Sequence, residues 1–341
     1  MKIIRLLLYP FSLIYGLITG IRNWLYNSSV LKSYKIPGTS ITVGNISVGG
    51  TGKSPMVDYL IELLNNHKVK VSTLSRGYGR VTKGLLEVKK TSTALEVGDE
   101  PLMYKQKYGD LIQGYVCEDR KTAIDHIRNK ADDCILLDDA FQHRKVKAGL
   151  QIVLSTFNAP FFNDHLLPAG NLRESRKGVR RADILIFTKA PKTLEESVKR
   201  RYIERSGFPP EKVFFSVIGY DTLKPLSDKA SVHLKQILLI TGIANPVPLV
   251  EELSKSKQVE LLRFPDHHNY TSADLIKIRE KFDTFEAFEK GIVTTEKDLM
   301  RLKEIPEFLE DIENWYVQPI KIKIDRERDL NDLITEYACK N

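Results

Sequence analysis

Apolar residues along the chain follow two alternating patterns, and together they indicate an α/β fold. Short apolar runs bounded by glycine and polar residues predict buried strands at 41–43, 70–74, 85–88, 111–116, 134–139, 151–155, 183–188 and 213–217. Segments in which apolar residues recur every three or four positions predict helices at 55–64, 119–129 and 192–206. Because strands that alternate with helices usually pair in parallel, we expect a largely parallel sheet.

The polar, turn-rich tract at 224–228 marks a candidate domain boundary. A second alternation follows it, with strands expected at 236–241, 259–264 and 291–294 and helices at 246–253 and 273–282. We therefore predict three parts: an N-terminal hydrophobic helix at 1–27, a core domain at 28–225, and a smaller C-terminal α/β domain at 226–341.

Residues 6–21 are almost wholly apolar, lie between Arg5 and Arg22, and are followed by Trp24 and Tyr26. A helix of this length measures roughly 24 Å, shorter than the ~30 Å hydrocarbon core of a bilayer. A signal peptide, a transmembrane anchor and a buried core helix are alternatives. The flanking arginines and aromatic residues favour a helix that lies in the membrane interface, on the cytoplasmic face.

A glycine-rich loop connects the first predicted strand to a helix, and it ends in Gly52-Lys53-Ser54. Strand, loop and helix in this order are the setting of a phosphate-binding loop, in which backbone N–H groups and the helix N-terminus hold phosphate. Lys53 would reach the β- and γ-phosphates of ATP, and the Ser54 hydroxyl would bind Mg²⁺. Ser47 stands where the general pattern has glycine. The predicted nucleotide-binding residues are Ser47, Val48, Gly49, Gly50, Thr51, Gly52, Lys53 and Ser54.

Two pairs of acidic residues are candidates for the site, one at the end of a predicted strand and one at the start of a predicted helix. The strand at 134–139 ends in Asp138 and Asp139, and adjacent like charges are costly unless a cation lies between them. We predict that they hold Mg²⁺ beside the loop. Pro101 suggests a helix start that makes Glu100 the cap, whereas capping does not explain Asp99.

Two further polar segments are candidates for the site. The basic run at 171–181 is either a solvated face or part of the catalytic crevice, where Arg173 could neutralise a phosphate in transfer. Asp266 and His267 lie in a loop that offers no obvious reason for burial, which favours a polar role.

Charge and cysteine content narrow the possible functions. The net charge is +8, and no Asp or Glu precedes Asp58. A basic chain can bind nucleic acid, an anionic membrane or an anionic substrate, but aromatic and basic residues do not interleave as in RNA-binding proteins, so we expect no nucleic acid. The three scattered cysteines fit a reducing compartment.

Several short motifs, in this order along the chain, resemble those of the tetraacyldisaccharide 4'-kinase family of lipid A biosynthesis. Ala140 departs from that pattern, because the family usually has glycine after the paired aspartates. The motifs are Ser47-Val-Gly-Gly-Thr-Gly-Lys-Ser-Pro55, Ser75-Arg-Gly-Tyr-Gly79, Gly98-Asp-Glu-Pro101, Asp138-Asp-Ala-Phe-Gln-His-Arg144, Pro168-Ala-Gly-Asn-Leu-Arg-Glu174, Thr241-Gly-Ile-Ala244, Phe264-Pro-Asp-His267 and Thr294-Thr-Glu-Lys-Asp298.

The resemblance implies an enzyme at the inner membrane that transfers the γ-phosphate of ATP to the 4'-hydroxyl of tetraacyldisaccharide 1-phosphate, giving lipid IVA. It implies a P-loop core with a smaller C-terminal domain closing over the nucleotide, and it explains Ser47 as the family's form of the loop. The expected partners are the lipid A disaccharide precursor and the anionic inner-membrane surface.

On this reading, Lys53, Ser54 and Mg²⁺ hold the phosphates, while Asp138, Asp139 and Glu100 hold the metal. Asp99 accepts the hydroxyl proton, oriented by His267 from the other domain, and Arg173 stabilises charge on the transferring group. His268 is the alternative to His267, and family position favours His267. The catalytic set is thus Asp99, His267, Lys53 and Arg173.

Two other functions share part of these features. A membrane-surface P-loop ATPase switch needs the loop and the paired aspartates but not an Asp99–His267 pair. A soluble small-molecule kinase or ligase leaves the hydrophobic N-terminus unexplained.

Overall fold

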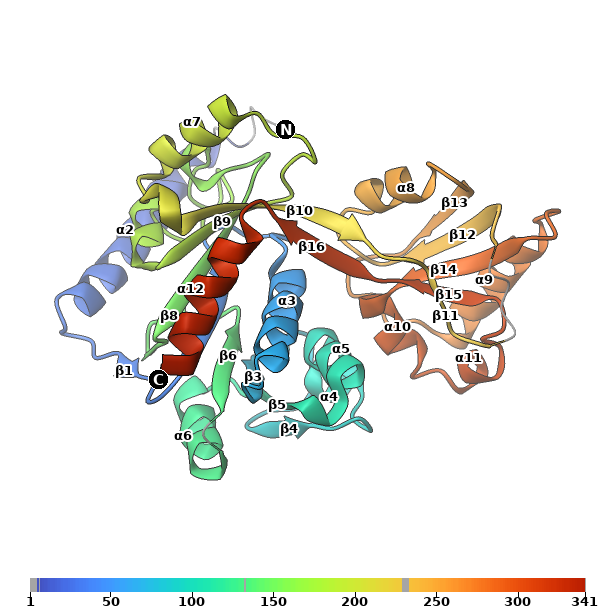
Figure 1. Ribbon diagram of the computed structural model, residues 1–341, viewed down its shortest axis with the longest axis horizontal. Coiled ribbons are helices and arrows are strands. Elements are labelled where there is room, and N and C mark those ends of the chain that lie inside the picture. Colours follow the sequence, from blue (N-terminus) through green and yellow to red (C-terminus); the bar gives the residue numbers. More distant parts are fainter. Residues whose placement is uncertain (1–4, 6, 132, 229–232, 341) are drawn as a thin grey trace.

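The computed structural model describes residues 5, 7–131, 133–228 and 233–340, arranged as two lobes (Figure 1). Residues 1–4 and 6, which belong to the predicted N-terminal helix, lie outside the described residues. The helices are α2 (Tyr9–Asn27), α3 (Lys53–Asn66), α4 (Ala94–Val97), α5 (Asp99–Tyr108), α6 (Arg120–Lys130), α7 (Glu196–Ser206), α8 (Val247–Leu253), α9 (Ser272–Asp283), α10 (Glu296–Leu302), α11 (Pro306–Glu310) and α12 (Glu327–Lys340).

The first lobe is built on a nine-stranded sheet in the order β16-β10-β9-β8-β2-β6-β3-β5-β4. Its pairs are parallel except for β4 with β5 and β10 with β16, which confirms the predicted largely parallel sheet. The strands are β2 (Ser40–Asn45), β3 (Val71–Ser75), β4 (Leu86–Val88), β5 (Ile112–Val116), β6 (Cys134–Asp138), β8 (Leu150–Thr156), β9 (Ile184–Thr188), β10 (Val213–Tyr220) and β16 (Ile320–Ile324). A separate short parallel pair joins β1 (Tyr34–Lys35) to β7 (Val146–Lys147).

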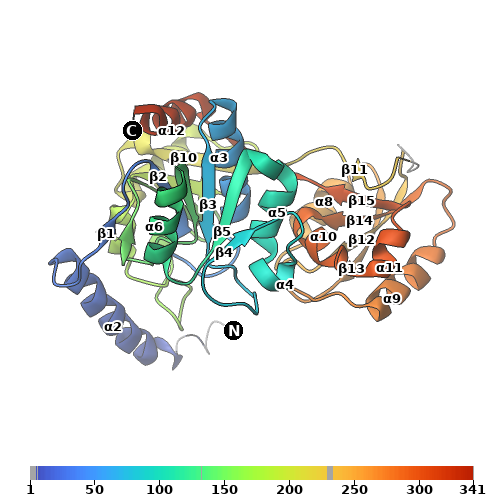
Figure 2. The ribbon, with the colours of Figure 1, turned by 90° about the horizontal axis from the view of Figure 1, so that it is seen from below.

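The second lobe contains a five-stranded sheet in the order β11-β15-β14-β12-β13. Its strands are β11 (Lys224–Pro225), β12 (Gln236–Thr241), β13 (Gln258–Arg263), β14 (Lys290–Thr295) and β15 (Trp315–Gln318). Figures 1 and 2 show this lobe at the opposite end of the molecule from α2. Strands β10 and β16 form a two-stranded antiparallel ribbon that leads from the first lobe toward the second (Figure 1).

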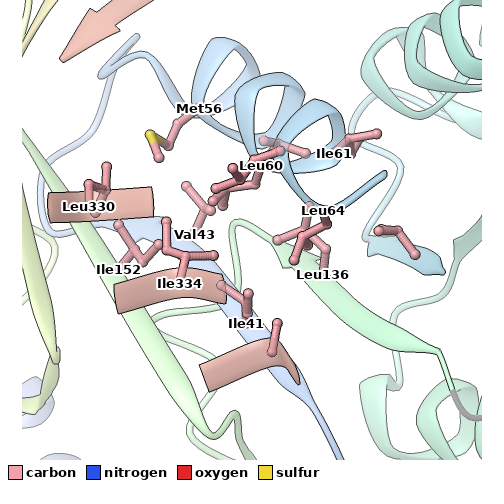
Figure 3. Packing of buried hydrophobic residues seen from close by; sticks show 14 of the residues in the cluster. Ile41, Val43, Met56, Leu60, Ile61, Leu64, Leu136, Ile152, Leu330 and Ile334 are labelled. Carbon is pink, nitrogen blue, oxygen red and sulfur yellow. The ribbon is translucent and has the colours of Figure 1, made fainter. Parts of the chain in front are cut away.

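The core of the first lobe forms where α3 and α12 pack on the central strands. All six residues of β2 are buried, as expected for a strand covered on both faces. Figure 3 shows Ile41 and Val43 of β2 together with Leu60 of α3 and with Leu330 and Ile334 of α12, all five fully buried.

The C-terminal segment differs from the predicted domain division. Residues 226–341 were expected to form one unit, but β16 pairs with β10 and α12 packs in the core of the first lobe. The physical reason is an apolar stripe, because Leu330, Ile334 and Ala338 recur every four residues and the core accepts them. The second lobe is therefore inserted into the chain of the first.

Helix α2 covers most of the predicted hydrophobic segment and lies on the surface of the first lobe (Figure 2). Within the described ranges, no helix combines the length and apolar character needed to cross a membrane. Of its residues only Ser12 is buried, and many apolar side chains point to solvent.

Replacing Ile334 by Ala should lower the free energy of unfolding of the first lobe by about 2 to 5 kcal/mol, because a fully buried side chain leaves a cavity in the core. Urea unfolding followed by far-ultraviolet circular dichroism measures the change. Leu333→Ala on the same helix is the control, since Leu333 is 36% exposed and its loss should cost much less. Equal effects of the two substitutions would contradict the packing of α12.

Candidate active site

The glycine-rich loop lies between the buried strand β2 and helix α3. Gly52 precedes the helix with a positive φ of 86°, and Gly49 has φ of 100°, so both positions favour glycine. Lys53 is the first residue of α3, and the free N–H groups of that helix start form an anion-binding site. The other end of the loop is tied to a distant segment, since the Val48 N–H donates to the Asn171 carbonyl.

Three side chains from neighbouring strands brace this loop. Asn45 donates to the Thr51 hydroxyl at 2.8 Å, and the Thr188 hydroxyl donates to the Thr51 carbonyl at 2.7 Å. The Lys189 ammonium donates to the Gly50 carbonyl at 2.7 Å, and burial lowers the pKa of Lys189. The sequence analysis missed Thr188 and Lys189, although they stand at the end of a predicted strand, where ligand-facing residues of an α/β sheet are found.

The paired aspartates lie beside the loop because β6 pairs in parallel with β2, with Val43 opposite Asp138. Asp139 lies 3.7 Å from the Lys53 ammonium and 3.3 Å from Arg173 Nη1. The backbone at Asp139 has φ of 51°, a rare conformation for a residue with a side chain. Ala140 is not in this region of φ, so its methyl group is tolerated where the related family usually has glycine.

Asp138 is buried, and its surroundings favour a cation. Its Oδ2 accepts a hydrogen bond from Tyr104 at 3.4 Å, while Oδ1 is buried without a partner among the described residues. Burial, together with the nearby charges of Glu100 and Asp139 and against the attraction of Lys53, raises the pKa of Asp138 to about 8. A carboxylate in this position gains a stable charge only when a cation offsets its burial.

Glu100 does not cap α5. Gly98 precedes the helix instead, with φ of 92°, and both Asp99 and Glu100 lie in its first turn. The Glu100 side chain consequently accepts a hydrogen bond from the Ser54 hydroxyl.

The candidate metal ligands therefore lie near one another: Ser54 bonds Glu100, and the charges of Glu100 and Asp139 act on Asp138. Across the described part of the chain, no group of three or more His, Cys, Asp and Glu residues is arranged to hold a metal ion. Mg²⁺ does not require one, because it is usually bound through one or two carboxylates, phosphate oxygens and waters. The buried, unpartnered Asp138 Oδ1 is the observation that fits such an ion.

Asp99 and His267 meet across the two lobes. His267 Nδ1 lies 2.9 Å from Asp99 Oδ2, and Asp99 is only 2% exposed. Asp99 Oδ1 accepts a second bond, at 2.6 Å, from Nε of Arg301 on α10. Burial raises the pKa of Asp99, but the hydrogen bonds from His267 and Arg301 outweigh it and hold the pKa below its ordinary value.

His267 and His268 have different surroundings. His267 has φ of 58°, the kind of backbone strain that accumulates at functional sites, and its ring lies against Tyr78. The Nε2 atom of His268 lies 3.0 Å from Asp274, and its ring stacks on Phe264. His267 thus contacts Asp99, and His268 belongs to the packing of the second lobe.

Helix α2 is joined to the segment that carries Arg173. Tyr15 donates to the Arg173 carbonyl at 2.8 Å, and Asn23 donates to Glu174 at 2.9 Å. Helix α2 is therefore bonded to the backbone of Arg173, whose side chain contacts Asp139. Its exposed apolar residues include Phe11, Leu13, Ile14, Leu17, Ile18, Ile21 and Trp24, each at least 50% exposed.

Comparisons with known proteins extend these observations to the whole chain. A family model described as tetraacyldisaccharide-1-P 4'-kinase matches residues 4–338. The chain belongs to this family. A relative named tetraacyldisaccharide 4'-kinase from Flavobacterium psychrophilum is 41% identical over 99% of this chain and 98% of the relative. A relative of the same name from Bacteroides fragilis is 40% identical over 98% of this chain and 93% of the relative.

A solved structure agrees with the family assignment. The "apo" form of LpxK from Aquifex aeolicus, crystallised in complex with ATP, superimposes with a TM-score of 0.75 at 30% identity and covers 98% of this chain and 99% of that one. The P-loop fold predicted from the sequence is thereby confirmed for this member of the tetraacyldisaccharide-1-P 4'-kinase family.

Replacing Asp138 by Asn should stabilise the protein in the absence of nucleotide and metal, and the gain in the free energy of unfolding should grow as pH rises from 5 to 8. The folded protein holds the Asp138 proton up to about pH 8, whereas an unfolded chain releases it near pH 4. The wild-type protein therefore loses stability over that window, by at most about 1.4 kcal/mol per pH unit, and the Asn variant does not. Urea unfolding in EDTA at both pH values tests this, and a gain that shrinks with pH would contradict it.

Proposed function

We propose that this chain transfers the γ-phosphate of ATP to the 4'-hydroxyl of tetraacyldisaccharide 1-phosphate, forming lipid IVA in lipid A biosynthesis. Family membership supports the reaction. The observation that carries it is the Asp99–His267 pair, which joins the two lobes close to a phosphate-binding loop. An alcohol loses its proton when it is phosphorylated, and an acid–base pair can accept that proton.

The loop and its helix bind the triphosphate. Backbone N–H groups of the loop after Val48 and at the start of α3 surround the phosphates, and Lys53 reaches the β- and γ-phosphates. The contact between Lys53 and Asp139 supports this role, since it keeps the ammonium at the edge of the loop. The bonds from Thr188 and Lys189 keep the loop carbonyls turned away from the anion.

Ser54, Asp138, Asp139 and Glu100 hold Mg²⁺ in this proposal. When bound, Mg²⁺ would supply positive charge that neutralises the phosphate oxygens. The unpartnered Asp138 oxygen and the Ser54–Glu100 hydrogen bond support this ligand set. In the absence of a cation, burial first and then the nearby charges of Glu100 and Asp139 raise the pKa of Asp138.

The Asp99–His267 pair accepts the proton of the attacking 4'-hydroxyl. Sugar hydroxyls are poor nucleophiles, and a positioned base contributes about 10²–10⁴-fold to such a reaction. Asp99 has a donor on each oxygen and is almost buried, so it acts together with the more exposed His267 ring. Because the two residues come from different lobes, the pair is complete only when the lobes meet.

Arg173, which contacts Asp139, neutralises charge on the phosphoryl group in transfer. Its guanidinium is 29% exposed, and its contacts with Asp139 and Gln142 are 3.3 and 3.4 Å long. Such long, partly solvated bonds let the side chain reach a stronger anion when one arrives.

Helix α2 attaches the enzyme to the cytoplasmic face of the inner membrane, where a tetraacylated substrate resides. Its exposed apolar residues form a face of the kind that lies in the boundary between headgroups and acyl chains. The hydrogen bonds of α2 to residues 173 and 174 support this attachment, since they join the helix to the segment that carries Arg173.

Replacing Asp99 by Asn should lower the rate of lipid phosphorylation at least about 10²-fold, because the base is lost. The assay incubates the protein with γ-labelled ATP, Mg²⁺ and tetraacyldisaccharide 1-phosphate and separates the labelled lipid. Asp110→Asn is the control, since Asp110 lies just beyond α5 and its side chain is 88% exposed. Near-normal turnover of the Asp99 variant would exclude it as a base.

The same assay distinguishes the other functions. A wild-type protein that releases labelled phosphate without labelled lipid is an ATPase switch, and a labelled water-soluble product indicates a soluble-substrate kinase. Either result would overturn the proposed reaction.

Replacing Leu17 and Ile18 together by Glu should weaken binding to vesicles of phosphatidylethanolamine and phosphatidylglycerol by about 10-fold or more. Both side chains are exposed on the protein, and the bound membrane loses two apolar side chains that it would bury. Co-sedimentation measures it. Phe288→Glu makes the same kind of change at an exposed apolar residue of the second lobe and should have little effect. Equal binding of the α2 variant would contradict attachment through this helix.

A further inference from the structure

Arg301 is a second residue of the inserted lobe that reaches the candidate site, and no motif of the sequence analysis singled it out. It lies on α10, and its Nε donates to Asp99 Oδ1 at 2.6 Å. Its Nη2 lies 3.4 Å from His267 Nδ1. One rigid guanidinium therefore contacts both members of the Asp99–His267 pair.

The Arg301–Asp99 ion pair is shielded from water. The Asp99 side chain is 2% exposed and that of Arg301 9%. Arg301 Nη1 is also buried, and it has no hydrogen-bond partner in the part of the chain that the structure describes. Burying an arginine this way is costly, so its position demands a compensating interaction, which the Asp99 carboxylate provides.

Lys297, one helical turn before Arg301, determines which nitrogen of His267 carries the proton. The Lys297 ammonium lies 3.2 Å from His267 Nε2, and an ammonium can only donate. We therefore assign Nε2 as the acceptor and Nδ1 as the N–H that donates to Asp99 Oδ2. The same ammonium lies 4.0 Å from Glu100, so Nε2 faces the side of the Ser54–Glu100 bond.

Resting on the proposed function, we propose that Arg301 is a positioning residue of the Asp99–His267 pair. It fixes the Asp99 carboxylate through Oδ1, so that Oδ2 stays aligned with His267 Nδ1–H and Nε2 stays the acceptor that faces the Lys297 ammonium. Arg301 acts through these two residues and does not contact the lipid or ATP. A planar guanidinium suits this task better than a flexible ammonium, because its donors are held in a fixed geometry beside Asp99 Oδ1.

The first test is kinetic. Arg301→Met keeps much of the side-chain volume and should lower kcat for lipid phosphorylation about 10²-fold, as expected when a catalytic group is displaced by about 1 Å. The KM for ATP should stay nearly unchanged, because the loop and the metal ligands are untouched. Arg301→Lys restores the charge but not the planar guanidinium, so its kcat should lie between those of the wild type and the Met variant.

Arg279→Met is the matched control. Arg279 also belongs to the second lobe and pairs with Asp311 on that lobe, and its loss should leave kcat and KM unchanged. A merely structural Arg301 would instead change the KM for ATP and kcat together, or give a Lys variant no better than Met. Either result, like a normal kcat for Arg301→Met, would overturn the proposal.

The second test does not depend on the reaction. In ¹⁵N-histidine NMR of the nucleotide-free protein, the wild-type His267 signals, assigned by their loss in His267→Gln, should show the tautomer protonated at Nδ1. Arg301→Met should give a mixture of tautomers or exchange broadening, whereas Arg279→Met should not. An unchanged His267 tautomer in Arg301→Met would refute the positioning role. In contrast, a wild-type protein that labels no lipid in the kinase assay would refute the proposed function, and the NMR measurement would still be valid.

Discussion

The parallel pairing of β2 with β6 is the constraint on which the site depends. It places the end of the strand that leads into the phosphate-binding loop next to the end of the strand that carries Asp138 and Asp139. Since the carboxyl ends of parallel strands meet at one edge, the cationic loop and the anionic pair have to share a small space. Asp138 is buried there beside Glu100, and in the proposed function a bound cation offsets the cost of that burial.

The second lobe adds the groups that the sheet edge lacks. His267 follows β13, while Lys297 and Arg301 lie on the short helix after β14, so a single end of the second sheet provides all three. They meet Asp99 at the first turn of α5. In the proposed function the site is thus divided between one lobe with the phosphate and metal ligands and another that arranges the proton acceptor, and the β10–β16 ribbon leads from one lobe toward the other.

Local sequence patterns revealed much of this arrangement. Glycine spacing before Lys53 and the apolar strand ending at Asp138 are short-range signals, and the structure brings both to one place. Asp99 stood out because capping did not explain it, and His267 because its loop offered no reason for burial. The Glu100 cap was wrong, since Gly98 can adopt a backbone conformation that starts the helix two residues earlier and frees Glu100 for Ser54.

The remainder depends on contacts between distant residues. Arg301 meets Asp99 across 202 positions, and nothing near Arg301 in the sequence indicates its partner. Thr188 and Lys189 act on the loop only because β9 and β8 bring them there. The alternation of isoleucine and lysine in 320–324 signals an edge strand, but it cannot indicate to which sheet the strand returns.

The return of the chain through β16 and α12 has a consequence for synthesis. Domains generally fold as units while the chain emerges, N-terminal parts first. Here the lobe that contains the phosphate-binding loop receives its last core residues only with the final helix. A polypeptide released before this helix would contain all the proposed phosphate and metal ligands, but its first lobe would lack part of its core. Formation of the nucleotide site therefore depends on completion of translation.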